Sequence, residues 1–195
     1  RSYVCKTGVG DVLIGAAAQA AEHNGVERAS HIKDKLVQMT HLNETMYAAG
    51  IASSHQGKAT KSGAFLNDDM LANVCKHHVT KMPFEIGRLA QDLAGGLVST
   101  APSEKELEHP ELKALLDKYL RGRADVPTEE RIRVLRLIEN MTMGRNAVGY
   151  LTESMHGAGS PQAQRIQIGR QMNLDFKKGL ARKLAGIDGD RSAED

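Results

Sequence analysis

The chain has 195 residues, a length at which one domain with a substantial hydrophobic core is expected. Its 26 basic and 24 acidic residues give a net charge of +2 without a basic stripe, and only 4% of residues are aromatic, which argues against nucleic acid as a partner. Two widely separated cysteines, Cys5 and Cys75, indicate a reducing, cytoplasmic compartment, and no apolar run approaches the ~20 residues of a membrane-spanning helix, so no membrane partner is expected.

The first half of the chain predicts helices through the spacing of its apolar residues. An alanine-rich segment predicts a helix from Asp11 to about Gly25. Polar residues 53–63 are expected to form a connection. A third long helix is predicted over residues 69–97, interrupted at Pro83 because proline lacks the amide hydrogen and clashes with the preceding turn. Between the first and third helices, a second is predicted by apolar residues three or four positions apart: Ile32, Leu36, Met39, Leu42, Met46 and Ala49.

The second half of the chain continues the helical pattern. Ser103 and Glu106 form a capping box that predicts a short helix, and residues 125–128 predict the start of another. Ser160, followed by a proline, predicts the N-cap of a helix that extends to about residue 184. Residues 187–195 are expected to form a polar tail. No stretch alternates with a period of two, so the prediction is an all-α domain, an antiparallel bundle of four long helices with extra short helices.

Three reactive residues lie close together near the start of the chain. Cys5 stands beside Lys6, and Tyr3 lies two residues before the cysteine. A thiolate near an ammonium group has a lowered pKa and is a better nucleophile or metal ligand. The alternative is that Cys5 is a small buried hydrophobic residue, and the sequence alone does not decide between the two.

Other polar stretches are weaker candidate sites. Glu153 lies at the end of an apolar helical pattern, where a carboxylate has to be solvated, paired or used. The turn that leads from it to Ser160 either binds an anion or simply joins two helices. Gly95 and Gly96 either allow close approach of a ligand or a helix, or simply end a helix. Residues 73–78 look like a metal motif, but their adjacent histidines would point to different faces of a helix, so no metal site is predicted there.

Several long strings of the chain together resemble one enzyme family. They are SYVCKTGVGDVLIGAAAQAA, ASHIKDKL, THLNET, ANVCK, EIGRLAQDLAGGL with PSEK, and VGYLTESMHGAGSPQAQRI. These strings resemble the C-terminal part of the 4-hydroxybutyryl-CoA dehydratase (vinylacetyl-CoA isomerase) family, within the wider flavin family that includes the 4-hydroxyphenylacetate 3-monooxygenases. The resemblance implies that residues 1–186 form the C-terminal helical-bundle domain of a longer enzyme, with the fold of an acyl-CoA dehydrogenase C-terminal domain.

The resemblance also implies cofactors, site residues and an assembly. Family members carry a [4Fe-4S] cluster held by three cysteines and one histidine, with FAD alongside. Cys5 matches the last of these cysteines, and the remaining ligands are expected before the first residue of this chain. Tyr3, Lys6 and Glu153 match active-site residues. Such bundles assemble as homotetramers and close over flavin from a neighbouring subunit, and Gly95–Gly96 is the candidate for that contact.

The implied reaction removes water from a CoA-thioester substrate, 4-hydroxybutyryl-CoA, to give crotonyl-CoA by a radical mechanism, with isomerisation of vinylacetyl-CoA as a companion activity. Proton removal next to the thioester is ordinary acid–base chemistry, whereas the unreactive neighbouring C–H bond calls for flavin, and iron can assist departure of the hydroxyl. Two alternatives stay open. One is a flavin-dependent aromatic hydroxylase of the 4-hydroxyphenylacetate 3-monooxygenase type, and the other is an isolated fragment that acts only as a non-catalytic oligomerising bundle.

Overall fold

The computed structural model describes residues 2–187, with side chains from Cys5 onward except at position 104; most of the predicted polar tail, residues 188–195, lies outside this range. Two short strands, β1 (Lys58–Ala59) and β2 (Phe65–Leu66), form a hairpin, and a 3-10 helix, η1 (Arg145–Gly149), precedes α9. The α-helices in the described range are α1 (Ser2–His23), α2 (Ser30–His55), α3 (Asp69–Val79), α4 (Met82–Ala94), α5 (Leu97–Thr100), α6 (Glu104–Glu108), α7 (Pro110–Tyr119), α8 (Thr128–Thr142), α9 (Thr152–Ala158), α10 (Pro161–Gln171) and α11 (Leu174–Leu184).

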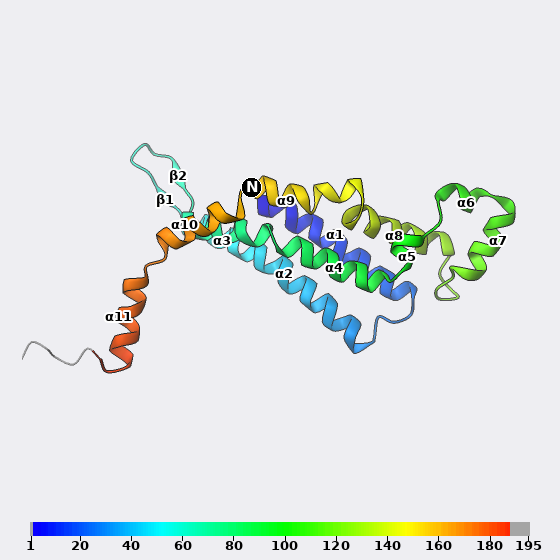
Figure 1. The fold of residues 1–195 in the computed structure, drawn as a ribbon, viewed down its shortest axis with the longest axis horizontal. Coiled ribbons are helices and arrows are strands. Elements are labelled where there is room, and N and C mark those ends of the chain that lie inside the picture. The colour runs from blue at the N-terminus through cyan, green and yellow to red at the C-terminus, as the bar shows by residue number, and fades with distance from the viewer. Residues whose placement is uncertain (1, 188–195) are drawn as a thin grey trace, which may run out of the picture.

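Helix α1 lies in the centre of the bundle. It contacts α2, α4 and α8, and α4 in turn contacts α2 and α8. These four helices run alternately in opposite directions, and α9 lies beside the start of α1 (Figure 1). The predicted all-α class is confirmed, and the hairpin is a small addition to it. The specific likeness to acyl-CoA dehydrogenases stays a prediction.

Small side chains on α1 allow its neighbours to approach closely. Four of its alanines, at positions 16, 17, 20 and 21, are buried. The predicted apolar faces of α2 and α8 point into the same core. Burial of this surface is the main favourable contribution to folding. Larger members of the core cluster are Leu13, Met39, Met46, Ile86, Leu89, Leu135 and Ile138.

Helix α1 begins at Ser2, nine residues before the predicted start at Asp11. The prediction was wrong because Gly8 and Gly10 are poor helix formers, whereas tertiary contacts decide the conformation here. Thr7 and Gly10 are buried, and α2 and α9 pack against this part of the helix. The first reactive residues of the chain are therefore presented on a helix.

The third predicted helix is divided into α3, α4 and α5. Pro83 lies in the first turn of α4, where a missing amide hydrogen costs nothing, so the predicted interruption at this proline is confirmed. Asp68 caps α3 by accepting a hydrogen bond from the Leu71 amide at 2.8 Å. Helix α4 ends at Ala94 and is capped by Gly95, which has a positive φ of 72°.

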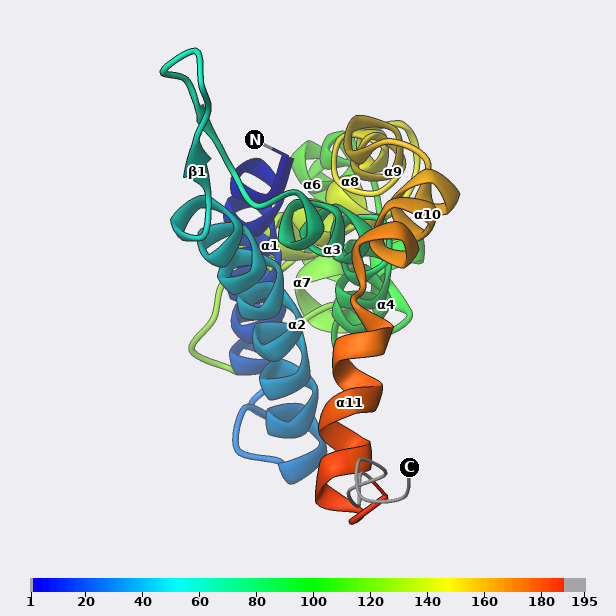
Figure 2. The ribbon, with the colours of Figure 1, turned by 90° about the vertical axis from the view of Figure 1, so that its left-hand side faces the viewer.

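The last predicted helix is also divided. The Asn173 side chain accepts a hydrogen bond from the Phe176 amide at 2.9 Å and so starts a new helix, α11, which is separated from α10 by two residues. Helix α11 has no buried residue, and it extends away from the bundle at the left of Figure 1, the side that faces the viewer in Figure 2. Among the described residues, no helix combines the length and the apolar character needed to cross a lipid bilayer.

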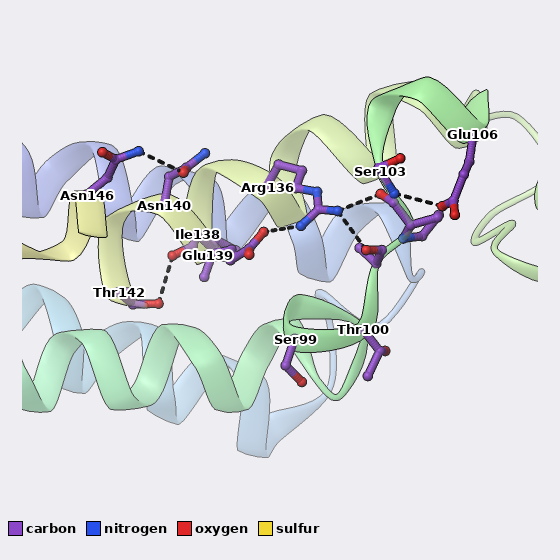
Figure 3. Close-up of polar contacts among 12 residues, drawn as sticks. Ser99, Thr100, Ser103, Glu106, Arg136, Ile138, Glu139, Asn140, Thr142 and Asn146 are labelled. Atoms are coloured by element: carbon purple, nitrogen blue, oxygen red, sulfur yellow. Dashed lines mark hydrogen bonds and ion pairs between the residues drawn. The ribbon is translucent and has the colours of Figure 1, made fainter. Parts of the chain in front are cut away.

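Arg136 fastens the connection between α5 and α6 to helix α8. Its Nη2 donates hydrogen bonds of 2.6 Å to the carbonyl oxygens of Ala101 and of the following proline, and its Nη1 pairs with Glu139 (Figure 3). The predicted capping box is confirmed, since the Ser103 amide donates to Glu106 at 2.8 Å. Two carbonyls that lack helical partners are thus satisfied by one guanidinium.

Candidate active site

Two residues 147 positions apart form an ion pair where α1 meets α9. The Lys6 side chain is only 7% exposed, and its Nζ contacts a carboxylate oxygen of Glu153. Nζ also donates a hydrogen bond of 2.5 Å to the Gly149 carbonyl oxygen. A buried ammonium group is tolerated only when such partners replace its water, so this pair sets how α9 sits on α1.

The local structure around Glu153 explains why both acceptors face Lys6. The 3-10 helix η1 ends at Gly149, so the carbonyl of this residue lies at a helix end and is available to a side chain. Glu153 lies in the first turn of α9, where the helix N-terminus favours a carboxylate. The Glu153 side chain is 53% exposed. One side of this carboxylate is therefore held by Lys6 while the rest is accessible to a bound molecule.

Cys5 lies one residue before Lys6 but is exposed, with a free thiol. The alternative interpretation, a buried hydrophobic cysteine, is therefore wrong. Adjacent residues on a helix point in directions roughly 100° apart, so the burial of Lys6 goes together with the exposure of Cys5. Tyr3 lies in the first turn of α1, and the placement of its side chain is outside the described part of the chain.

Cys5 can supply one thiolate ligand to a metal centre. Among the residues that the structure describes, no group of three or more His, Cys, Asp or Glu side chains is placed to hold a metal ion. An iron–sulfur cluster needs several such ligands. An exposed thiol in the first turns of α1 fits one corner of a cluster whose other ligands would have to come from outside these residues.

A second polar contact lies next to Lys6 and was not predicted from the sequence. The Asn43 side-chain amide on α2 donates to the Thr7 carbonyl at 3.1 Å and to the Asp11 carboxylate at 2.8 Å. Tyr150 follows Gly149 and is 2% exposed, and burial, followed by the charge of Asp11, raises the pKa of its phenol above the ordinary value. Both residues lie within the strings that carry the family resemblance, but nothing in the sequence indicates that they flank the same turn of α1.

A cleft of about 540 Å³ lies between α2, α3 and the end of α9. Its polar lining includes Ser53, Asp69 and Lys76, and Gly157 lines it from α9. A Cβ atom at Gly157 would lie 2.8 Å from Oε1 of Glu153, so the carboxylate and this cleft are neighbours.

Cys75 lines the same cleft but is chemically inert at neutral pH. It is 3% exposed, and its thiol donates to the Met46 carbonyl at 3.4 Å. Burial raises the pKa of this thiol to about 11, so it stays protonated.

Gly95 and Gly96 follow α4, at the end of the bundle opposite the start of α1 (Figure 1). The structure therefore does not bring them to Lys6 and Glu153 of the same chain. Both are exposed, and no heavy atom lies within 4 Å of a Cβ atom built at either position. The Gly96 carbonyl accepts hydrogen bonds from the hydroxyls of Ser99 at 3.0 Å and Thr100 at 3.1 Å.

The turn between α9 and α10 is explained by helix capping. Gly159 has a φ of 90°, and Ser160 accepts a hydrogen bond from the Ala163 amide at 3.4 Å. Gln164 donates to the carbonyls of residues 158 and 159 at 2.8 and 3.0 Å. These contacts match the simpler of the two predictions for this turn, a connection between helices.

Comparison with known proteins places the fold and these residues in context. Residues 1–186 match the family described as HpaB, 4-hydroxyphenylacetate 3-hydroxylase C terminal. The chain is 54% identical over 191 residues to the 4-hydroxybutyryl-CoA dehydratase/vinylacetyl-CoA-Delta-isomerase of Clostridium aminobutyricum, covering 94% of this chain and 39% of that relative. It is 72% identical to the solved oxygen-tolerant archaeal 4-hydroxybutyryl-CoA dehydratase from N. maritimus, with a TM-score of 0.90 over 96% of this chain and 38% of that one.

A more distant solved structure shares the fold. The oxygenase component of 4-hydroxyphenylacetate 3-monooxygenase, complexed with FAD and 4-hydroxyphenylacetate, has a TM-score of 0.84 at 22% identity and covers 95% of this chain and 38% of that one. The chain thus spans less than half the length of these relatives. Because the family match runs from residue 1 to residue 186, the chain belongs to the HpaB family, 4-hydroxyphenylacetate 3-hydroxylase C terminal.

Proposed function

We propose that the chain is the C-terminal helical part of a dehydratase that uses FAD and a [4Fe-4S] cluster to convert 4-hydroxybutyryl-CoA to crotonyl-CoA and to isomerise vinylacetyl-CoA. The observation that carries the proposal is a buried Lys6, paired with an accessible Glu153, one residue after an exposed cysteine. Identities of 54% and 72% to proteins with the dehydratase name support it. The aromatic hydroxylase is less favoured, because its 22% identity supports the fold alone.

In this proposal the residues of the chain hold one cluster corner and move protons. Cys5 is a cluster ligand. Glu153 exchanges a proton with the bound thioester, and Lys6 compensates the charge of this carboxylate and keeps it in one orientation. Tyr3 contributes a hydrogen bond beside them. When bound, the flavin supplies radical chemistry and the cluster supplies a Lewis-acidic iron.

The proposal includes a homotetramer in the cytoplasm. Gly95 and Gly96 contact FAD that belongs to a neighbouring subunit. Their exposure, and their distance from Lys6 along the bundle, support a role at a different subunit's site (Figure 1). The two free cysteines of this chain agree with a reducing compartment.

Iron analysis of the full-length polypeptide, purified without oxygen, tests the proposal. Iron and acid-labile sulfide should be present, and Cys5→Ala should lose iron and dehydration while keeping its helical circular dichroism. Cys75→Ala is the matched control, because this thiol is buried and bonded to a backbone carbonyl, and it should keep its iron. Iodoacetamide should label Cys5 only after a chelator has removed the iron, whereas Cys75 should stay unlabelled.

Two outcomes would contradict the proposal at different points. A wild-type protein without iron or sulfide would leave the aromatic hydroxylase as the better interpretation. An iron-loaded protein in which Cys5 is labelled as fast as in the iron-free protein would remove Cys5 from the ligand set.

A further inference from the structure

Asn43 is a buried polar residue between two apolar residues on the buried face of α2. It is 2% exposed, whereas its neighbours along the same face of α2, Met39 and Met46, are fully buried methionines. Its amide donates to the Thr7 carbonyl at 3.1 Å and to an Asp11 oxygen at 2.8 Å. Both acceptors lie on α1, within the first three turns of that helix.

Gly10 allows the Asn43 side chain to lie directly against the backbone of α1. A Cβ atom at position 10 would lie 2.2 Å from Oδ1 of Asn43, closer than any real contact allows. Among the described residues, Oδ1 itself accepts no hydrogen bond. A buried acceptor without a partner lowers stability. The Asn43 side chain therefore contributes little net stability, but its directional hydrogen bonds fix the position of α1 relative to α2.

The rest of the α1 surface gives little resistance to rotation or sliding. Between Leu13 and the buried His23 at its last residue, the buried side chains of this helix are alanines, at positions 16, 17, 20 and 21. Small side chains form shallow ridges, whereas one directional polar contact can fix the register of two helices. Asn43 makes such a contact with the carbonyl of Thr7, the residue that follows Lys6.

We propose that Asn43 is a positioning residue that fixes the rotation and axial position of the first turns of α1 and thereby places Cys5 and Lys6. Lys6 is held from the opposite side by Gly149 and Glu153. The turn that presents both reactive residues is therefore fixed by α2 on one side and by η1 and α9 on the other. The expected effect of Asn43 on the iron–sulfur cluster rests on the proposed function. Its expected effect on the position of the first turns of α1 does not.

Three variants of the full-length protein test this inference. Asn43→Leu keeps approximately the volume and removes both hydrogen bonds. Asp11→Asn keeps a side-chain oxygen that can accept from Asn43, so it separates the hydrogen bond from the charge. Met39→Ala, one turn earlier on α2 and also buried, is the control for a general loss of core packing.

Amide hydrogen exchange and iron content are the two readouts. In Asn43→Leu, exchange of amides 6–11 should be about tenfold faster, with amides 13–23 changed far less, and iron per subunit should fall below half of the wild-type value. Asp11→Asn should exchange like the wild type. Met39→Ala should melt at a lower temperature and keep both its iron and the relative protection of amides 6–11.

The outcomes separate this inference from the proposed function. Wild-type exchange in Asn43→Leu, or faster exchange with full iron content, would overturn the inference and leave the proposed function standing. Exchange in Asp11→Asn as fast as in Asn43→Leu would also overturn it, because the charge would then be the cause. A wild-type protein without iron would overturn the proposed function, and the exchange of amides 6–11 would still decide whether Asn43 positions the helix.

Discussion

At the scale of single residues, two adjacent glycines have different physical reasons to be glycine. Gly95 ends α4 with φ 72° and ψ −171°, a region that residues with a Cβ atom rarely adopt. Gly96 has φ −60° and ψ −25°, which any residue adopts, and open space around its Cα atom. The backbone conformation therefore requires glycine at position 95 only. A functional reason for Gly96 has to come from a molecule that contacts it.

Alanine substitutions should separate the two positions. Gly95→Ala is expected to lower the free energy of unfolding by about 1–3 kcal/mol, because it forces a strained backbone conformation. Gly96→Ala should change it by less than about 0.5 kcal/mol. Urea unfolding followed by circular dichroism measures both. If both variants lost the same free energy of unfolding, the positive φ at position 95 would not be the reason for glycine there.

The Cys75 thiol should make the fold sensitive to alkali. Its pKa is raised by burial from 9.0 to about 11, so the folded state binds this proton more tightly than the unfolded state. The stabilisation is complete below pH 9 and is lost as the pH rises towards 11, by about 2–3 kcal/mol in total. Cys75→Ala should flatten this part of the pH profile in urea titrations. Parallel profiles for wild type and Cys75→Ala would contradict the prediction.

Residue chemistry could be predicted from the sequence more fully than residue contacts. For Cys5 the sequence left two alternatives open, a reactive or metal-binding thiol and a small buried hydrophobic residue. The resemblance singled out Lys6 and Glu153 without indicating that they touch. Their contact depends on how η1 and α9 return to the start of α1, and no local pattern encodes a pairing across 147 positions. Asn43 was overlooked because one asparagine in a helical stripe resembles a surface position until the partner helix is known.

At the scale of elements, the ion pair between Lys6 and Glu153 joins α1 to α9 with unequal partners. The lysine side chain is 7% exposed and the glutamate side chain is 53% exposed. Removing Glu153 leaves the buried ammonium group of Lys6 without its counter-charge. Removing Lys6 leaves the carboxylate of Glu153, which water can solvate.

The two partners should therefore differ in their effect on stability. Glu153→Ala is expected to lower the free energy of unfolding by about 1–3 kcal/mol. Lys6→Met, which fills the buried position with an apolar chain of similar length, should cost less than half of that loss. Urea unfolding of the iron-free full-length proteins gives the comparison without any contribution from ligands. A larger loss for Lys6→Met would mean that packing around the lysine stem dominates.

Helix boundaries show which local signals were sufficient. Pro83 and the capping box at Ser103 were read correctly because proline and capping side chains act on their own backbone. The early start of α1 was missed, since burial of Thr7 and Gly10 overrides their low helix propensity. The break before α11 depends on one asparagine that bonds its own backbone, a signal too short to outweigh the surrounding periodicity.

At the scale of the whole molecule, α11 carries an apolar face that nothing in the described chain covers. Phe176, Leu180 and Leu184 follow each other at a spacing of four and are 62%, 49% and 90% exposed. A helix of 11 residues is marginal in water without tertiary contacts, so its stability has to come from packing on another surface. We expect a neighbouring subunit of the proposed homotetramer to provide that surface.

Replacing this face should therefore weaken the assembly. The double substitution Phe176→Ser and Leu180→Ser in the full-length protein is expected to lower the mass measured by light scattering below that of a tetramer, because the buried apolar area drives association. Val37→Ser, at an apolar position of α2 that is 67% exposed, is the control for loss of a single surface side chain and should leave the mass unchanged. A double variant that keeps both the tetramer mass and the wild-type exchange of amides 174–184 would show that α11 is stabilised without this face. Reduced mass together with retained iron would place the helix in assembly and outside the metal centre, as expected from its separation from the bundle (Figure 1).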